Sequence, residues 1–270
     1  MFTPTTNTGK LFQRYLKSVD HPSKIRMLNF IGKVIFRKGI LLKNRDGTCF
    51  CLDPNDWITR TILLAGNYEP HSVKLAKSIL KNGGLFVDVG ANFGLFTCQV
   101  GKLNCNVSAI AIEPNYKILG TLINNVKLNN LQQQVKIFNM ALSDEIGFLN
   151  LEQPVSNNIG RTVTNNSSKG SLFLFCSSLN FFYKQNIHEQ IALMKIDIEG
   201  NEFNILKNFS FELYPVNNFI LEYNEIGETG FIALRDFFSN KGYNCFSING
   251  KPLNEFSEAI PENNIWFTKK

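Results

Sequence analysis

One segment restricts most strongly how this chain can fold. It is a short apolar run with an acid near its carboxyl end, and a glycine-rich turn follows it. The run covers residues 85–89 and includes Asp88, and Gly90 and Gly94 lie in the turn before a predicted helix. In open α/β sheets ligands bind beyond the carboxyl ends of the strands, and glycine lets the backbone approach a ligand without a Cβ atom in the way. The segment therefore predicts an α/β protein with a ligand site at this turn.

Strands and helices alternate in the rest of the chain. Apolar runs predict strands, and the stretches between them have helical spacing. The predicted strands are residues 85–89, 107–112, 135–140, 191–197 and 219–222, and the predicted helices are residues 69–81, 95–103, 116–128, 201–208 and 231–241. Strands joined by crossover helices form a doubly wound, mostly parallel sheet with helices on both faces. Residues 243–248 and 265–268 predict an antiparallel hairpin that closes this sheet.

The chain before this pattern is organised differently. Residues 1–10 are polar and predicted to be disordered, and helical spacing follows at residues 11–19 and 23–37. A turn between two short apolar runs then predicts a hairpin. We therefore expect residues 1–56 to form a helical and hairpin extension and residues 57–270 to form the main domain.

The charge balance is mildly basic. The chain has 28 Lys and Arg residues against 22 Asp and Glu, a net charge of +6, which is short of what a dedicated nucleic-acid-binding protein usually shows. Much of the excess lies early, at Lys17, Lys24, Arg26, Lys33, Arg37, Lys38, Lys43 and Arg45. We expect a solvated surface here, with a patch that meets an acidic acceptor or partner as the alternative.

Cysteine and histidine usage predicts no metal site. The six cysteines contain no Cys-x-x-Cys pair and the three histidines are scattered, so the thiols are expected to be reduced. No stretch is long and apolar enough to span a bilayer, and residues 1–10 lack the apolar core of a secretory signal. These patterns predict a cytoplasmic protein without a membrane span.

A second acid, Glu113, ends the next predicted strand. From that position a carboxylate can accept hydrogen bonds from both hydroxyls of a ribose. A ligand with an amino acid at one end and a ribose at the other fits both strand ends, and S-adenosylmethionine is such a ligand. The Gly-x-Gly-x-x-Gly fingerprint of dinucleotide sites fails because Asn92 stands two residues after Gly90. The structural alternative is that Gly90 and Gly94 merely serve a tight turn.

Four motifs resemble those of the FkbM-type methyltransferases. They are Asp88-Val-Gly-Ala-Asn-Phe-Gly, Glu113-Pro-Asn, Ala141-Leu-Ser-Asp and Lys195-Ile-Asp-Ile-Glu-Gly-Asn-Glu, in the family's order. The resemblance implies a class I methyltransferase (Rossmann-like) fold, S-adenosylmethionine as methyl donor and O-methylation, often of sugars or small secondary metabolites. Matching positions imply cofactor contacts at Asp88, Gly90, Asn92, Gly94 and Glu113, with Ala141 and Ser143 near the adenine end.

Two features depart from the family pattern. The family often has a Thr-Leu-Asp-like element ahead of its Lys-x-Asp-x-Glu-Gly motif, and the nearest match here is Ser178-Leu179-Asn180. The surrounding residues 153–190 are rich in Asn and Ser and are the least regular stretch, which predicts a long loop or a lid on the acceptor side. Both departures concern the acceptor more than the cofactor.

The motif that starts at Lys195 supplies candidate catalytic acids. Side chains alternate along a strand, so Lys195 and Asp197 are predicted to point to one face, with Glu199 beside them if the strand continues. The functional interpretation is that Asp197 or Glu199 accepts the proton of an acceptor hydroxyl, while Glu222, at the next strand end, orients the acceptor. The structural alternative is an ion pair with exposed carboxylates.

Three functions remain open from the sequence. The first is an O-methyltransferase that acts on a hydroxyl of a saccharide or small metabolite. The second is an N-methyltransferase that acts on a peptide or nucleic acid, although the chain lacks an Asn-Pro-Pro-Tyr type motif. The third is a non-catalytic scaffold with the same fold. The acids at two strand ends argue against a scaffold.

Overall fold

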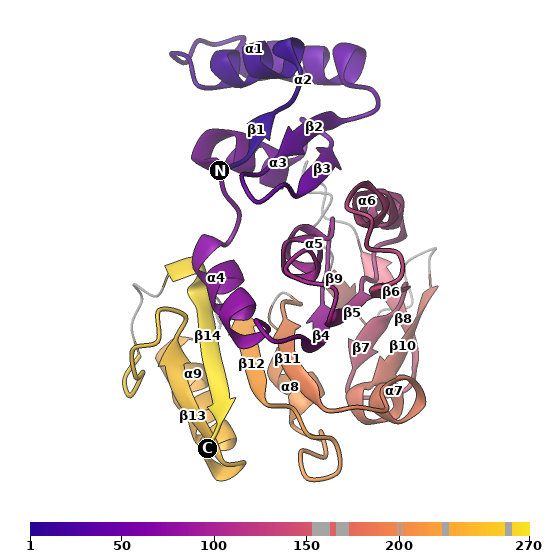
Figure 1. Ribbon diagram of the computed structural model, residues 1–270, viewed down its shortest axis with the longest axis vertical. Coiled ribbons are helices and arrows are strands. Elements are labelled where there is room, and N and C mark those ends of the chain that lie inside the picture. Colours follow the sequence, from indigo (N-terminus) through magenta and orange to yellow (C-terminus); the bar gives the residue numbers. More distant parts are fainter. Residues whose placement is uncertain (153–162, 166–172, 199, 201, 223–226, 257–260) are drawn as a thin grey trace.

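A seven-stranded sheet forms the centre of the computed structural model, which describes residues 1–152, 163–165, 173–198, 200, 202–222, 227–256 and 261–270 (Figure 1). The strand order is β13-β14-β12-β11-β4-β5-β6. The strands are β4 (Gly84–Val89), β5 (Val107–Ile112), β6 (Val135–Phe138), β11 (Ile191–Ile196), β12 (Asn218–Glu222), β13 (Tyr243–Ser247) and β14 (Asn264–Lys269). β14 is antiparallel to both neighbours, whereas β12, β11, β4, β5 and β6 are mutually parallel. The predicted doubly wound sheet with a closing hairpin is confirmed.

Helices cover both faces of this sheet. They are α4 (Pro70–Ile79), α5 (Leu95–Gly101) and α6 (Tyr116–Leu128) on one face, and α7 (Leu179–Asn186), α8 (Glu202–Leu206) and α9 (Gly227–Asn240) on the other. Alternate residues of β4 enter the two cores: Phe86 packs with the first group and Val87 with the second. Residues 86, 88 and 195 therefore share the α4–α5 face.

The N-terminal part is ordered from its first residues. Its elements are β1 (Thr3–Pro4), α1 (Asn7–Leu16), α2 (Lys24–Ile35), β2 (Ile40–Lys43), β3 (Cys49–Leu52) and α3 (Trp57–Ala65). The prediction that residues 1–10 are disordered is wrong, because β1 pairs with β2 and Phe2 is buried against the ring of Phe50. The Thr6 side chain accepts a hydrogen bond from the Gly9 N–H and starts α1 earlier than the apolar spacing suggested.

The prediction of a long loop over residues 153–190 is wrong for its described parts. β10 (Phe173–Ser178) and β9 (Val163–Asn165) join β7 (Ala141–Ser143) and β8 (Gly147–Glu152) in a second sheet of order β7-β10-β8-β9. The Asn- and Ser-rich residues around them concealed these strands, although β10 itself begins with the apolar run Phe173-Leu-Phe-Cys. Pairing with β7 and β8 supplies the hydrogen bonds that an isolated segment lacks. The remaining residues, 153–162 and 166–172, lie outside the described part.

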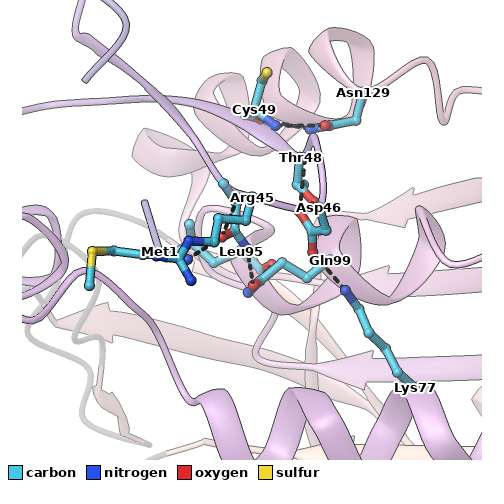
Figure 2. A network of polar contacts seen from close by, with 10 residues as sticks. Met1, Arg45, Asp46, Thr48, Cys49, Lys77, Leu95, Gln99 and Asn129 are labelled. Carbon is cyan, nitrogen blue, oxygen red and sulfur yellow. Dashed lines mark hydrogen bonds and ion pairs between the residues drawn. The ribbon is translucent and has the colours of Figure 1, made fainter. Parts of the chain in front are cut away.

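Asn125 of α6 and Asn129, the C-cap residue of this helix, attach the β2–β3 hairpin to α6, and Figure 2 shows the contact between Asn129 and Cys49. Asn129 accepts from the Cys49 N–H at 2.9 Å and donates to the Cys49 carbonyl at 2.7 Å, as a neighbouring strand would. Asn125 accepts from the Cys51 N–H and donates to the Phe93 carbonyl, both at 2.8 Å. The same helix thereby holds the hairpin and the glycine-rich turn.

An ion pair and a shared core add to this attachment. Asp46 in the hairpin turn pairs with Lys77 of α4 at 2.7 Å. One continuous apolar cluster contains Phe12 and Leu28 of the N-terminal helices together with Phe86 of the sheet. The boundary at residue 56 stays a prediction. Among the described residues, no helix combines the length and apolarity needed to cross a membrane.

We expect Asn125→Ala to lower the free energy of unfolding by about 2–4 kcal/mol, because it leaves the Cys51 N–H and the Phe93 carbonyl without partners. Urea denaturation measures this change. The matched control is Asn124→Ala at the adjacent exposed position, for which a change within about 0.5 kcal/mol is expected. Equal effects of the two substitutions would contradict the bridging role of Asn125.

Candidate active site

Four acids lie at the carboxyl ends of four adjacent parallel strands. Glu222 ends β12, Asp197 follows β11, Asp88 lies near the end of β4 and Glu113 follows β5. The strand register aligns Lys195 with Asp88 and with Ile220, so these four acids share the face that α4 and α5 cover. The structure therefore brings together the predicted acids at the sheet edge where ligands of such folds bind.

Asp88 has one satisfied and one unsatisfied carboxylate oxygen. Its side chain is buried, and the Thr97 hydroxyl of α5 donates to Oδ2 at 2.5 Å. Oδ1 is buried without a hydrogen-bond partner in the described structure. Burial raises the pKa of Asp88, although Lys195 and Thr97 act in the opposite direction. A buried acceptor of this kind calls for a donor such as an ammonium group.

Glu113 binds the backbone on both sides of its strand end. Its Oε2 accepts from the Asn92 N–H at 2.8 Å, and its Oε1 accepts from the Asn115 N–H at 2.7 Å. Burial nevertheless raises its pKa to about 7. Each carboxylate oxygen has two acceptor sites, so one site per oxygen remains for a ribose hydroxyl. Glu113 thus combines the predicted ligand position with an ordering role for the glycine-rich turn.

Steric constraints that are not visible in the sequence explain why glycine occupies both positions of the turn. A Cβ atom at Gly90 would lie 1.9 Å from the carbonyl oxygen of Asp197, and one at Gly94 would lie 2.5 Å from Leu122 of α6. Both residues also have positive φ, 84° and 75°. Gly90 allows the ends of β4 and β11 to meet, and Gly94 allows α5 to start against α6. The alternative that these glycines serve a tight turn therefore has direct structural support.

Asn92 lies between these glycines in a left-handed conformation, with φ of 51°. Its N–H is held by Glu113, and its side-chain Oδ1 is buried without a hydrogen-bond partner in the described structure. The turn therefore presents a second unsatisfied acceptor beside Asp88. Sequence analysis predicted both residues as cofactor contacts, and the structure places both at the same strand end.

Lys195 is a buried cation among acids. Its side chain is 2% exposed, and its Nζ lies 2.6 Å from Asp197 Oδ2 and 3.5 Å from Glu69 Oε2. The ring of Phe96 lies below the ammonium, 5.3 Å from Nζ to the ring centroid. Burial alone would lower the pKa of Lys195, but Asp197 and Glu69 raise it well above its usual value. The lysine therefore remains charged.

Glu69 is a site residue that the sequence analysis missed. It precedes Pro70 at the start of α4 and has φ of 41°, a left-handed conformation that turns the chain into the helix. Burial raises its pKa to about 7, although the charge of Lys195 lowers it. The Tyr-Glu-Pro sequence marks a helix start, but only the fold places this carboxylate beside Lys195.

Asp197 and Glu222 form a carboxyl pair at the accessible end of this cluster. The Asp197 side chain is 24% exposed, and a hydrogen bond joins it to the Glu222 side chain. Burial would raise the pKa of Asp197, but Lys195 and the hydrogen bond from Glu222 hold it below its usual value. Glu199 lies outside the described residues.

The predicted adenine-end residues lie on β7, directly after the last parallel strand. Ala141 is buried and Ser143 is half-buried, with its hydroxyl bonded to Asp144 at 3.1 Å. Asn139, a residue that the sequence analysis did not single out, donates to the Glu113 carbonyl at 2.8 Å and to the Pro114 carbonyl at 3.1 Å. It thereby connects the start of β7 to the Glu113 strand end.

The arrangement fits a ligand with an ammonium and a ribose. Unsatisfied acceptors lie at Asp88 and Asn92, and Glu113 keeps free acceptor sites on the adjacent strand. Within the described part of the chain, no group of three or more His, Cys, Asp or Glu side chains is arranged to hold a metal ion. The carboxyl groups at this edge can take part in hydrogen bonding and in proton acceptance.

The raised pKa of Glu113 predicts that stability falls with pH. A carboxyl group whose native pKa of about 7 exceeds the 4.5 of an ordinary Glu binds its proton more tightly when folded, so stability is lost as pH rises between these values. We expect the free energy of unfolding of Glu113→Gln, relative to the parent, to rise by a few kcal/mol between about pH 5 and about pH 8.

Urea denaturation at both pH values measures this difference. The exposed Glu212→Gln is the control and should follow the parent at each pH. A Glu113→Gln variant with the parent's pH dependence would show that burial does not perturb this carboxyl group.

Comparison with known proteins identifies the family. The chain matches the model of the methyltransferase FkbM domain over residues 88–245. A segment of 67 residues is 43% identical to a tRNA (guanine(37)-N(1))-methyltransferase of Macaca mulatta, covering 24% of this chain and 13% of that protein. The chain thus spans a small part of the curated relatives that it matches.

Solved structures similar to the chain include two methyltransferases. Methyltransferase FkbM from Methylobacillus flagellatus KT has a TM-score of 0.47 at 12% identity, over 95% of this chain and 57% of that chain. A putative caffeoyl-CoA O-methyltransferase from Staphylococcus aureus has a TM-score of 0.47 at 11% identity, over 79% and 90%. The fold assignment therefore rests on the strand order observed here. Because the family model spans more than half of its length, this chain belongs to the FkbM methyltransferase family.

Proposed function

We propose that this protein is an S-adenosylmethionine-dependent O-methyltransferase that acts on a hydroxyl group of a saccharide or small metabolite. The observation that carries the proposal is the row of four acids at adjacent strand ends. Two of them, Asp88 and Glu113, flank the glycine-rich turn, and the other two, Asp197 and Glu222, form a pair beyond it. This division matches a cofactor half and an acceptor half.

The cofactor half supplies binding groups. Asp88 and Asn92 would accept hydrogen bonds from the amino-acid end, and Glu113 would accept them from the ribose hydroxyls. Ala141 and Ser143 on β7 would border the adenine. When bound, S-adenosylmethionine supplies an electrophilic methyl group, and the protein holds the acceptor oxygen in line with it.

The acceptor half supplies a proton acceptor. The Asp197 and Glu222 side chains are both partly exposed, so one of them would take the proton that the acceptor hydroxyl loses. Lys195 stabilises the ionised form of Asp197 and holds it beside β4. Glu199 remains the alternative base that the sequence motif nominates.

N-methylation of a nucleic acid is the second candidate, because the curated relatives are named as tRNA (guanine(37)-N(1))-methyltransferases. The match to the relative from Macaca mulatta covers 24% of this chain. The +6 net charge permits such a partner, whereas the carboxyl pair suits removal of a hydroxyl proton.

The free state of all six cysteines supports the proposal of a reducing, cytoplasmic location.

We expect the protein to bind S-adenosylmethionine and S-adenosylhomocysteine without a metal, measured by isothermal calorimetry with a chelator present. Glu113→Gln should weaken both affinities roughly ten- to a hundredfold, because it loses charge-assisted hydrogen bonds to the ribose. Glu212→Gln should bind like the parent. The absence of binding heat for the parent would refute the cofactor assignment, and an unchanged affinity of a folded Glu113→Gln would refute the role of Glu113.

We expect Asp197→Asn or Glu222→Gln to lower kcat by about 10²–10⁴ while cofactor affinity is kept, because each removes proton acceptance by the pair. Transfer of radiolabelled methyl from S-adenosylmethionine is first measured on a panel of hexoses, glycosides, hydroxylated metabolites, peptides and tRNA. Initial rates with the best acceptor then compare the variants, with Glu199→Gln as the alternative base.

The exposed Asp236→Asn is the matched control and should keep the parent rate. Parent-like turnover of both pair variants would place the base elsewhere. Loss of cofactor binding in both would assign this strand end to the cofactor half. Label in tRNA or peptide, with none in the hydroxyl compounds, would favour N-methylation.

A further inference from the structure

The positive charge of the chain is concentrated in residues 1–52, the section of the N-terminal part that ends with β3. Residues 1–52 contain ten Lys and Arg residues and two acids, whereas the remainder contains eighteen Lys and Arg residues and twenty acids. The excess of the whole chain therefore comes from this part. Helices α1 and α2 of this part lie together at one end of the long axis, and the C-terminus lies at the other (Figure 1).

Helix α2 has a buried face and an outward face. Lys24, Leu28 and Gly32 are buried at intervals of four residues and face the core. The residues on the opposite side, together with Arg37 directly after the helix, form what we call the α2 outer face: Met27, Phe30 and Val34, and Arg26, Lys33 and Arg37. At 100° per residue, the first three form one stripe, and Arg26 and Lys33 form a second stripe beside it.

The apolar stripe is open to solvent. Phe30 is 67% exposed, Val34 is 54% exposed and Met27 is 46% exposed. Contiguous exposed apolar side chains on one helix face mark an interaction surface more often than single scattered ones do.

The basic stripe has no acidic partner within the part of the chain that the structure describes. Arg26, Lys33 and Arg37 are exposed, and none of them takes part in an ion pair there. Their charges are therefore available to an anionic surface. A helix with an apolar stripe beside Lys and Arg residues is typical of segments that lie in the interface of a bilayer.

We propose that the α2 outer face docks the protein onto an anionic membrane surface. Met27, Phe30 and Val34 would enter the headgroup region, and the three basic residues would bind lipid phosphates and carboxylates. A second copy of the chain is disfavoured because it would bring two strongly basic parts together. Single-stranded nucleic acid is bound through stacked aromatic rings, and this stripe contains one.

Docking at this face would orient the whole molecule. The N-terminal part is joined to the main sheet by Asn125, Asn129 and the Asp46–Lys77 ion pair. The active-site edge would therefore keep one orientation relative to the bilayer. This inference does not depend on the proposed acceptor chemistry.

Co-sedimentation with vesicles tests the proposal. We expect the full chain to bind vesicles of phosphatidylcholine with phosphatidylserine and to bind vesicles of phosphatidylcholine alone much more weakly. The variant Phe30→Glu/Val34→Glu and the variant Arg26→Glu/Lys33→Glu/Arg37→Glu should each lower affinity for the anionic vesicles roughly tenfold or more. High salt should weaken binding of the parent.

Two controls separate this surface from general effects. Lys74→Glu/Lys127→Glu/Lys136→Glu makes the same charge change at exposed positions elsewhere, and Leu213→Glu replaces another exposed apolar residue. Both should bind anionic vesicles better than the matching α2 variants, and all variants should keep the parent's circular dichroism and cofactor affinity.

Three results would overturn the proposal. The first is no binding of the parent to anionic vesicles. The second is equal loss of binding in the α2 variants and their controls. The third is a solution dimer, or a complex with polyuridine, that the Phe30→Glu/Val34→Glu substitution abolishes while vesicle binding persists.

Discussion

The buried ammonium of Lys195 is the charge around which the site is arranged. A buried cation is costly unless acids compensate it, and removal of one partner of such a pair typically costs about 3–5 kcal/mol. Here the compensation comes from Asp197 after β11 and from Glu69 at the start of α4, with Asp88 on β4 contributing to the field. One lysine therefore couples two strand ends and a helix start on the same face of the sheet.

The approach of two strand ends explains the glycine at the start of the turn. The Asp197 N–H donates to the Val89 carbonyl at 3.0 Å, and the Asp197 carbonyl lies so close to the end of β4 that a Cβ atom at Gly90 would overlap it. Glu113 completes the turn from the other side by accepting the Asn92 N–H. The residues that order this turn also present unsatisfied hydrogen-bond acceptors at the edge of the sheet. The same side chains therefore stabilise the local structure and are available to a ligand.

The N-terminal part extends the architecture without interrupting the sheet. Asn125 and Asn129 of α6 satisfy backbone groups of β3 that would otherwise form an open edge. The N-terminal part thereby shares the apolar core of the α4–α5 face while its outer helices carry an unbalanced positive charge. These contacts hold the sheet, with its row of acids, and the basic N-terminal helices in a fixed relative position.

The sequence by itself determined the order of strands and helices, the doubly wound sheet and the acids at its edge, because hydrophobic periodicity and strand ends are local properties. Only the tertiary structure decided that Glu69 joins Lys195, since these residues are far apart in sequence and meet through packing of α4 on β11. The same applies to residues 1–10, where Phe2 becomes ordered only because Phe50 and strand β2 are there to receive it. The composition of a segment indicates which structure it favours in isolation. Its burial and strand pairing depend on other elements that are brought close only when the chain folds.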